Sequence, residues 1–365
     1  MMRKSKPGGR ELVAALIFLI MIVLMSGCDQ AEITEKDSSA TVSITDCAGR
    51  QVEIPAKVER VACLCPDAAY TLAMFGQGDK MVAVVDGIKR DIILNDMYPT
   101  IKDLPVPKSS GVINIEELIG TRPDVVFVKR DISGSEAETE KLEKVKIPFL
   151  VVDYNSIEEQ LYAAEMIGKV TGETKKAKQY REYYQACIKR VQDQIQDIDP
   201  QQRVRVYHSI NEATRTDVAG SLSGDWLEAA GAYNVSAQEK LKLLEGKYYA
   251  GLEQILLWDP EVILVNETGV DEYILTNTQW ASLQAVKNNK VYKLPSGISR
   301  WGHPSSPETP LAILWTAKTL YPDRFNDLDM AEECRNFYKE FFGLELSDEV
   351  IQSVLYGDGM RAARQ

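Results

Sequence analysis

The segment Ile115–Val128 reads IEELIGTRPDVVFV, and a similar segment, LEQILLWDPEVILV, occurs at Leu252–Val265. The two align without a gap, and the matched positions include Glu116 with Glu253, Pro123 with Pro260, and Asp124 with Glu261. In each copy an amphipathic turn of helix should end before the proline, because the residue that precedes a proline is disfavoured in the helical conformation. Four apolar residues follow, as is typical of a strand buried on both faces of a parallel sheet.

The repeat indicates that one α/β unit occurs twice and that the chain has two similar lobes. Two copies at so long a spacing indicate domain duplication rather than a solenoid, which stacks several short repeats. A chain of 365 residues is long enough for two domains of ordinary size. The expected fold class is therefore α/β, with two similar lobes of mostly parallel sheet.

The composition is that of a globular protein with an acidic surface. Hydrophobic residues make up 45% of the chain and charged residues 26%, which excludes wholesale disorder and a polytopic membrane protein. The formal net charge of −12 disfavours nucleic acid as a partner, because nucleic-acid binding depends on basic patches. The same acidity favours solubility and docking on a basic partner.

Residues 1–27 have the form of a secretory signal peptide. A basic start precedes the apolar run Leu12–Met25, which is shorter than the ~20 residues that span a bilayer. The segment Leu24–Cys28 reads LMSGC and resembles a bacterial lipobox, which implies lipid attachment at Cys28 and an extracytoplasmic protein anchored to the bacterial membrane. An uncleaved membrane anchor is the alternative and leaves the same domain outside the cell. Residues 28–40 are polar and are expected to form a tether.

The other cysteines suggest neither a zinc site nor a disulfide framework. Their spacing matches no zinc pattern. The five residues are Cys47, Cys63, Cys65, Cys187 and Cys334. Cys63 and Cys65 lie two apart in an expected strand and so point to opposite faces, which disfavours a bond between them. We interpret these cysteines as small buried apolar residues.

The folded part is expected to begin at Thr41 with an edge hairpin. The segment Thr45–Val61 fits the pattern TDxxGRxVxIPxxxxRV and resembles the opening of the periplasmic-type binding proteins for ferric siderophores, haem and cobalamin. Those proteins are the solute receptors of ATP-driven importers. The resemblance extends to about Phe342, and it implies two lobes that are joined by one long helix and enclose a ligand cleft.

Residues 173–198 fit that joining helix. They contain neither glycine nor proline and carry apolar residues at helical spacing. The expected division is an N-terminal lobe at 41–172, the interlobe helix at 173–198 and a C-terminal lobe at 199–365. Because a helix is stiff, closure around a ligand should be small.

The candidate binding residues follow from the expected strands, because ligands of open parallel sheets bind beyond the carboxyl ends of the strands. They are Pro66, Asp67, Lys129 and Arg130 in the first lobe, and His208, Ser209, Asn266, Arg300, Trp301 and His303 in the second. The segment Ser299–Pro304 is the richest, since Arg can bind an oxyanion or carboxylate through its fork and Trp can stack on a planar ligand. The alternative is that this segment only packs over the end of the sheet.

The ligand class follows from the residue types. Two histidines disfavour a free zinc or manganese ion, and no resident cofactor or metal is expected. Haem is not excluded as a ligand, because a single His or Tyr can bind its iron. A chelated metal needs only a shaped cleft of polar and aromatic groups. The expected function is capture of a metal chelate, namely a ferric siderophore, haem or cobalamin, and a molybdate- or tungstate-type oxyanion bound by Arg300 is the alternative within the same fold.

Glu116 and Glu253 occupy equivalent places in the repeat. In the resembled family one exposed carboxylate on each lobe docks on arginines of the membrane permease, and the resemblance implies this role here. The alternative is that a duplicated helix keeps a solvent-facing glutamate for solubility. The expected partners are an ABC permease, the small ligand and, through Cys28, the membrane; the protein is expected to be monomeric.

Two functions of other classes fit less well. An extracellular α/β hydrolase needs a nucleophile elbow, but Gly220–Gly224 reads GSLSG and has Leu222 at the nucleophile position. A structural adhesin would have no cleft and no small ligand. No enzymatic activity is therefore expected.

Overall fold

The structure of the protein, a computed structural model, describes residues 40–244, 246–358 and 360–362. The predicted signal peptide, the predicted lipidation site Cys28 and residues 28–39 of the predicted tether lie outside the described residues. Within the described ranges, no helix is both long enough and apolar enough to cross a membrane.

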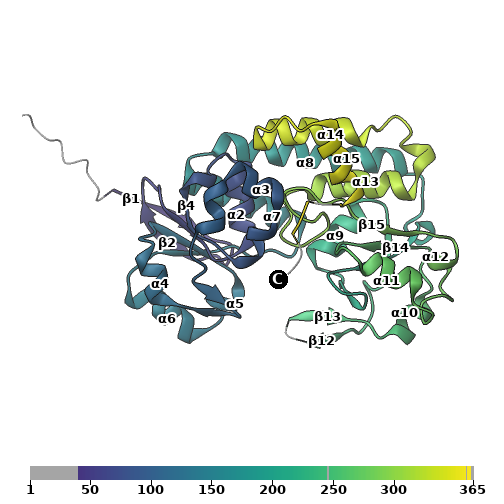
Figure 1. Ribbon diagram of the computed structural model, residues 1–365, viewed down its shortest axis with the longest axis horizontal. Helices are drawn as coiled ribbons and strands as arrows, with labels where there is room; N and C mark the ends of the chain where they lie inside the picture. The colour runs from purple at the N-terminus through teal and green to yellow at the C-terminus, as the bar shows by residue number, and fades with distance from the viewer. Residues whose placement is uncertain (1–39, 245, 359, 363–365) are drawn as a thin grey trace, which may run out of the picture. The chain divides into compact units, whose positions relative to one another are not determined.

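The first lobe, whose helices α2 to α6 are labelled in Figure 1, is built on a four-stranded parallel sheet with the order β4-β3-β7-β8. Its strands are β3 (Val61–Cys63), β4 (Met81–Ala83), β7 (Val125–Val128) and β8 (Phe149–Val151). The α-helices of this lobe are α2 (Pro66–Met74), α3 (Ile92–Met97), α4 (Ile115–Gly120), α5 (Arg130–Ser133), α6 (Glu136–Lys144) and α7 (Ile157–Thr171). Two antiparallel pairs complete it, the predicted edge hairpin β1 (Thr41–Thr45) with β2 (Gln51–Pro55), and β5 (Lys108–Ser109) with β6 (Val112–Ile113).

The second lobe repeats this plan with the parallel order β11-β9-β14-β15. Its strands are β9 (Arg205–Ser209), β11 (Tyr233–Asn234), β14 (Val262–Val265) and β15 (Val291–Lys293), and its helices are α9 (Leu222–Ala229), α10 (Leu252–Trp258), α11 (Val270–Thr276) and α12 (Gln284–Lys287). A small antiparallel sheet is added with the order β10-β13-β12, from β10 (Arg215–Thr216), β12 (Lys242–Leu244) and β13 (Lys247–Tyr249). The predicted α/β fold of two similar lobes is confirmed.

The repeated segment forms the same unit in both lobes, α4 with β7 and α10 with β14. All four residues of each strand are buried, as the apolar runs predicted. The residue before each proline, Arg122 or Asp259, has a positive φ, of 48° or 42°, and the chain leaves the helix there. The carboxylates that follow the prolines cap the neighbouring strands, because Asp124 accepts from the backbone N–H of Arg60 at 2.8 Å and Glu261 from that of Arg205 at 2.9 Å.

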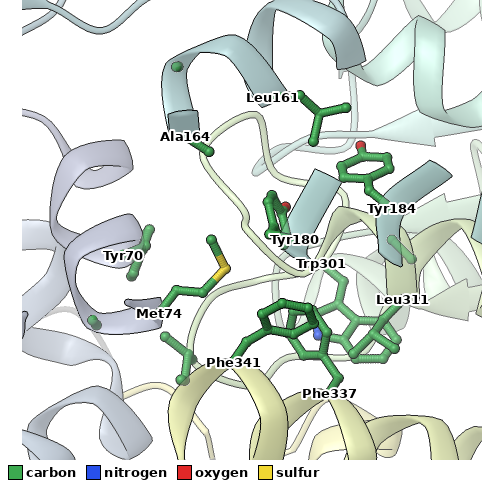
Figure 2. Packing of buried hydrophobic residues seen from close by; sticks show 14 of the residues in the cluster. Tyr70, Met74, Leu161, Ala164, Tyr180, Tyr184, Trp301, Leu311, Phe337 and Phe341 are labelled. Atoms are coloured by element: carbon green, nitrogen blue, oxygen red, sulfur yellow. The ribbon is translucent and has the colours of Figure 1, made fainter. Parts of the chain in front are cut away.

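Helix α8 (Thr174–Ile195) lies in the stretch where the long helix was predicted, and it packs on α7 and α13. Its buried face carries Tyr180, Tyr184, Cys187 and Val191, spaced by three and four residues. The Tyr180 hydroxyl donates to the carbonyl of Pro307 at 2.8 Å, which ties α8 to the second lobe. Figure 2 shows Tyr180 and Tyr184 beside Trp301, Leu311 and Phe341 in the core.

The closing helices are α13 (Thr309–Leu320), α14 (Met330–Phe337) and α15 (Asp348–Tyr356), with a π-helical turn at Tyr338–Phe342. Helix α9 is capped by Ser221, which has the extended backbone of a cap residue and whose hydroxyl accepts from the Gly224 N–H at 3.1 Å.

The described cysteines are all free, and four of the five are buried. Burial raises the pKa of the Cys65 thiol to about 12 and that of Cys47 to about 11. Such thiols remain protonated at neutral pH and are poor nucleophiles, which agrees with the interpretation of these residues as small apolar side chains.

Candidate functional site

Each parallel sheet has one switch point, where its strand order reverses between the two central strands. The switch points lie between β3 and β7 in the first lobe and between β9 and β14 in the second. Ligands of such sheets bind outside the carboxyl ends of the strands at this point. The loops that follow these four strands are therefore the structural candidates for a binding site.

At the second switch point, polar side chains from three loops hydrogen-bond to one another. Asn211 has a left-handed backbone with φ of 63°, which turns its N–H onto the side-chain carbonyl of Asn266 at 2.9 Å. The Arg300 guanidinium donates to the side chains of both Asn211 and Glu267. Burial lowers the pKa of Arg300 from its ordinary value, and Glu267 acts against that effect, so Arg300 is a cation at neutral pH.

A cavity of about 690 Å³ opens beside this cluster. Six of the described residues that line it are basic, namely Arg90, Arg215, Lys247, Lys293, Arg300 and Arg361. Two lining residues are acidic, Glu212 and Glu267, and two further carboxylates, Asp91 and Asp358, pair with the lining cations Arg361 and Lys293. Positive groups thus outnumber negative ones at this cavity although the chain as a whole is acidic, which makes the cavity attractive to an anion.

The cavity also receives residues from the first lobe and from the segment after α15. The chain leaves α15 at Gly357, where φ is 68° and a Cβ would lie 2.7 Å from the carbonyl oxygen of Leu294, so this turn requires glycine. Beyond it, the Ala362 N–H donates to the carbonyl of Arg90 at 2.8 Å, and the Arg90 side chain donates back to the carbonyl of Ala362 at 2.9 Å. Arg361 and Ala362 therefore form part of the cavity wall against the first lobe.

The predicted first-lobe residues lie at their own switch point rather than around this cavity. Asp67 is buried, and its carboxylate lies 3.1 Å from the Lys129 ammonium, which also faces the Tyr154 ring at 5.8 Å. Burial alone would lower the pKa of Lys129, but Asp67 raises it above its ordinary value, so Lys129 keeps its positive charge at neutral pH. Asp67 and Tyr154 line a void of only about 10 Å³.

The two remaining first-lobe candidates have structural surroundings. Pro66 is the first residue of α2, where its missing N–H costs nothing. Arg130 has a side chain that is 72% exposed and pairs with Asp153 at 2.6 Å. Neither residue lines the large cavity in the described part of the chain.

The predicted segment Ser299–Pro304 divides between the cavity and the core. Arg300 faces the cavity, whereas Trp301 is fully buried among the core residues shown in Figure 2. His303 is half-buried, and burial together with Arg300 and Lys129 holds its pKa well below the ordinary value, so this imidazole is neutral. The structure therefore places the cation of this segment on the cavity wall and the aromatic ring in the core, where it cannot stack on a ligand.

A buried carboxylate holds this loop in place. Glu308 accepts from the backbone N–H groups of Ile298 at 3.0 Å and Ser299 at 2.7 Å, and also from the hydroxyl of Tyr338. Gly297 is required beside it, because a Cβ there would lie 1.7 Å from the Tyr338 hydroxyl oxygen. The position of Arg300 thus depends on a buried hydrogen-bonded network behind it.

The other second-lobe candidates are His208 and Ser209, which lie at the end of β9. Both are fully buried, and His208 Nδ1 lies 2.7 Å from a carboxylate oxygen of Asp217. The Ser209 hydroxyl donates to the carbonyl of Glu212 at 2.9 Å. Of the ten predicted binding residues, Asn266 and Arg300 are the ones that line the large cavity in the described chain.

Five cations of the cavity were missed by the sequence reasoning. They are Arg90, Arg215, Lys247, Lys293 and Arg361. Lys293 is the last residue of β15, so the rule about strand ends could have selected it. The other four do not directly follow a strand of either parallel sheet, so that rule does not select them. Within the described residues, no group of three or more His, Cys, Asp or Glu side chains is arranged to hold a metal ion.

Both predicted docking residues are exposed, in the first turns of their helices. Glu116 lies on α4 and Glu253 lies on α10, at matching places of the repeated unit. Their exposure leaves both carboxylates accessible to a partner.

Comparison with known proteins gives the family to which this chain belongs. The model of the periplasmic binding protein family matches residues 61–297, which is more than half of the chain. The chain belongs to the periplasmic binding protein family. Its members include the substrate-binding receptors of ABC importers, which are extracytoplasmic proteins that bind small ligands and work with a membrane permease; they are not enzymes.

Three relatives are informative. The molybdate-binding protein MolA of Haemophilus influenzae is 28% identical over 323 residues, which cover 82% of this chain and 90% of MolA. The structure of MolA bound to molybdate has a TM-score of 0.75 and 26% identity, and the match covers 84% of this chain and 99% of that one. YvrC of Bacillus subtilis, described as an ABC transporter substrate-binding lipoprotein, is 25% identical over 85% of this chain and 96% of its own. The vitamin B12-binding protein of Vibrio parahaemolyticus is 24% identical, and the match covers 70% of this chain and 87% of that protein.

Proposed function

We propose that this protein is the receptor of an ABC importer for an oxyanion of the molybdate or tungstate type, bound in the cavity beside Arg300. The observation that carries the proposal is the gathering of six cationic side chains around one cavity of an acidic protein. Charge-assisted hydrogen bonds from guanidinium groups are among the strongest contacts available to an oxyanion. The similarity to molybdate-binding MolA supports the same ligand class.

The donors at the second switch point suit such a ligand. Arg300 supplies a planar fork, and the Nδ2 group of Asn266 is buried and has no hydrogen-bond partner among the described residues. A buried amide donor without a partner is costly, so an acceptor that reached it would be stabilised. An oxyanion offers several acceptor atoms within a small radius and could engage both side chains.

The size of the cavity favours a second candidate, an anionic metal chelate. A volume of about 690 Å³ lies within the range of small-molecule pockets and exceeds what one tetrahedral oxyanion fills. A chelate that carries carboxylate or catecholate groups would use the same cations. Similarity to a vitamin B12-binding protein is a further reason to test chelates as ligands.

We also propose that Cys28 carries a lipid and that Glu116 and Glu253 dock on the permease. The lipoprotein description of the related YvrC supports the first proposal. The exposure of both glutamates at matching places supports the second. The lobes of the receptor would then divide near 172 and 199, on either side of the helix that contains α8.

Calorimetric titration with molybdate, tungstate, sulfate and phosphate tests the ligand class. We expect saturable binding of molybdate or tungstate, weakened on the order of a hundredfold in Arg300→Gln, because loss of a buried charge-assisted hydrogen bond costs roughly 2–3 kcal/mol. Arg324→Gln is the matched control, since Arg324 forms an ion pair with Asp197 on the surface.

Analysis of the protein purified from its native host distinguishes the two ligand classes. An absorption spectrum and metal analysis would reveal a corrinoid, haem or ferric chelate, whereas molybdenum or tungsten without a chromophore supports an oxyanion. If none of the four oxyanions binds and a coloured chelate is recovered, the oxyanion proposal is wrong and the chelate takes its place.

A further inference from the structure

The carboxylate of Asp91 forms a buried ionic contact at the edge of the cavity. The Asp91 side chain is 2% exposed, and it accepts from the Tyr70 hydroxyl at 2.5 Å and from the Arg361 guanidinium. Arg361 also donates to the carbonyl of Gly87 at 3.0 Å, and its side chain lines the cavity. The guanidinium thus has one face on the first lobe and another toward the space where an anion would bind.

The segment that carries Arg361 is fixed by backbone hydrogen bonds. The Ile92 N–H donates to the carbonyl of Met360 at 3.1 Å, and the Ala362 N–H donates to that of Arg90 at 2.8 Å. These two bonds flank Arg361, so its position beside Asp91 does not depend on a long flexible side chain alone.

Arg361 retains an unused donor in this position. Its Nε group is buried and has no hydrogen-bond partner within the described residues. A guanidinium has five N–H donors and needs acceptors on several sides when it is removed from water. Because the Arg361 side chain lines the cavity, an anion there would lie beside a cation whose donors Asp91 and Gly87 do not exhaust.

Charged or titratable groups from four elements act electrostatically on Asp91. They are Arg361 from residues 360–362, Arg300 from the loop after β15, the Tyr70 hydroxyl from α2 and Glu308 at the start of α13. Glu267 in turn faces Arg361. Two guanidinium groups are therefore held by two carboxylates, Arg300 by Glu267 and Arg361 by Asp91, and an anion must compete with those carboxylates for them.

We propose that Arg361 is a ligand-binding cation of this receptor, that Asp91 is the counter-ion that holds it before the anion arrives, and that anion binding is coupled to uptake of one proton by Asp91. The proposal rests on the anion-receptor function given above. The proton comes from solvent and converts the Asp91 carboxylate to a carboxylic acid, which removes one negative charge next to the incoming anion. Arg361 then has its positive charge available for the ligand.

The surroundings of Asp91 favour this exchange. Burial raises the pKa of Asp91 to about 7, against the lowering effects of Arg361 and Tyr70. An added anion raises this pKa further, because like charges disfavour ionisation. Binding should therefore be strongest below about pH 7, where Asp91 is protonated before the anion arrives, and should weaken as the pH rises above that value. His303 does not contribute to this titration, since its pKa is held well below the ordinary value.

Titration calorimetry with molybdate measures both the affinity and the protons taken up when it is run at about pH 6 and about pH 8, in two buffers of different ionisation enthalpy. For the unchanged protein we expect uptake of a fraction of a proton at the higher pH and weaker binding there, because Asp91 is already largely protonated at the lower pH. Arg361→Gln should bind roughly tenfold more weakly at the lower pH, as expected for loss of a charge-assisted contact. Asp91→Asn should show one affinity at both pH values and no proton uptake.

Two further variants separate this role from a purely structural one. Arg361→Lys keeps the charge and should recover most of the affinity lost in Arg361→Gln. Tyr70→Phe removes a hydrogen bond that lowers the pKa of Asp91, so the pH at which affinity declines should move upward. Arg324→Gln serves as the control for loss of an exposed, ion-paired arginine.

The outcomes distinguish failure of this proposal from failure of the proposed function. If the unchanged protein binds no oxyanion at any pH, the anion-receptor function itself is wrong. If it binds an oxyanion and folded Arg361→Gln binds it equally well, Arg361 is not a ligand-binding cation. If Asp91→Asn keeps the pH dependence and the proton uptake, Asp91 is not the coupled group.

Discussion

The two parallel sheets are alike at the amino ends of their central strands and different at the carboxyl ends. In the first lobe the carboxylate of Asp124 caps the chain before β3, and the Arg60 side chain donates to the carbonyl of Arg122 at 2.9 Å. In the second lobe Glu261 caps the start of β9, and the Arg205 side chain donates to the carbonyl of Trp258 at 2.7 Å. An arginine and a carboxylate thus tie the repeated helix–strand unit to the neighbouring strand in both lobes.

At the carboxyl ends the two lobes use charge differently. The first-lobe cation Lys129 is neutralised by Asp67 within a site that has almost no free volume. The second-lobe cation Arg300 lies on the wall of a cavity with five other basic side chains. The comparison teaches that the supporting frame is repeated in both lobes, whereas the residues at the carboxyl ends of the strands differ between the copies.

The largest effect we expect concerns Trp301, which was predicted to line the site and lies in the core. Trp301→Ala should lower the free energy of unfolding by roughly 3–5 kcal/mol, because a fully buried indole leaves a cavity that its neighbours cannot fill. Its neighbour Arg300 should show the opposite balance in Arg300→Gln, with loss of anion affinity and a smaller loss of stability than in Trp301→Ala.

Urea denaturation of both variants, combined with anion titration, checks this division. Stability of Trp301→Ala close to that of the unchanged protein, with affinity lost, would mean that the indole contacts the ligand. In that case Trp301 would belong to the binding site together with Arg300, and not to the core.

A smaller effect tests the repeated caps. Asp124→Ala should destabilise the protein by roughly 1–2 kcal/mol, because its carboxylate accepts from the N–H groups of both Glu59 and Arg60 at 2.8 Å. Glu261→Ala should cost about half as much, since Glu261 accepts from one backbone N–H at 2.9 Å. Neither change should alter anion affinity, because both carboxylates lie at the opposite end of the strands from the cavity.

Denaturation midpoints of the two variants, with Glu117→Ala as an exposed control on α4, provide the measurement. Equal and negligible losses would show that water replaces these caps. The matching carboxylates of the repeat would then have no role in stability.

The frame could be predicted from the sequence because its signals are local. Composition and spacing alone predict the buried strands, because apolar runs close both repeated segments. They also predict the long helix, because the stretch before Ile195 has no glycine. Asn266 was predicted because it directly follows β14, and Arg300 because its segment follows an expected strand and combines a cation, an aromatic ring and an imidazole. These signals require no knowledge of which distant segments meet.

The rest of the site could not be predicted because it depends on long-range packing. Lys247 reaches the cavity on a small antiparallel sheet, and Arg361 reaches it on a segment that pairs with residues near Arg90. Whether Trp301 or Arg300 turns toward the ligand depends on how Glu308 and Tyr338 hold the loop from behind. No spacing rule connects a loop residue at 300 with a hydroxyl at 338.

The smallest effect per residue is expected at the outer surface, where the two lobes are alike again. If Glu116 and Glu253 dock on the permease, each carboxylate should contribute less than about 1 kcal/mol, because exposed ion pairs are weak. Together they orient the receptor, so the double variant Glu116→Ala/Glu253→Ala should weaken docking roughly tenfold at low salt and much less at high salt.

Vesicle uptake assays of the double variant, at low and high ionic strength, measure this effect, with ligand affinity checked separately by calorimetry. The matched control is Glu117→Ala/Glu272→Ala, which removes one exposed carboxylate from each lobe away from the matching places. Normal transport by the first pair, or equal loss in both pairs, would mean that the repeated glutamates serve general solubility. A loss confined to the first pair would instead mean that duplication preserved a matched contact on the outside of the receptor while the ligand-binding ends of the two sheets diverged.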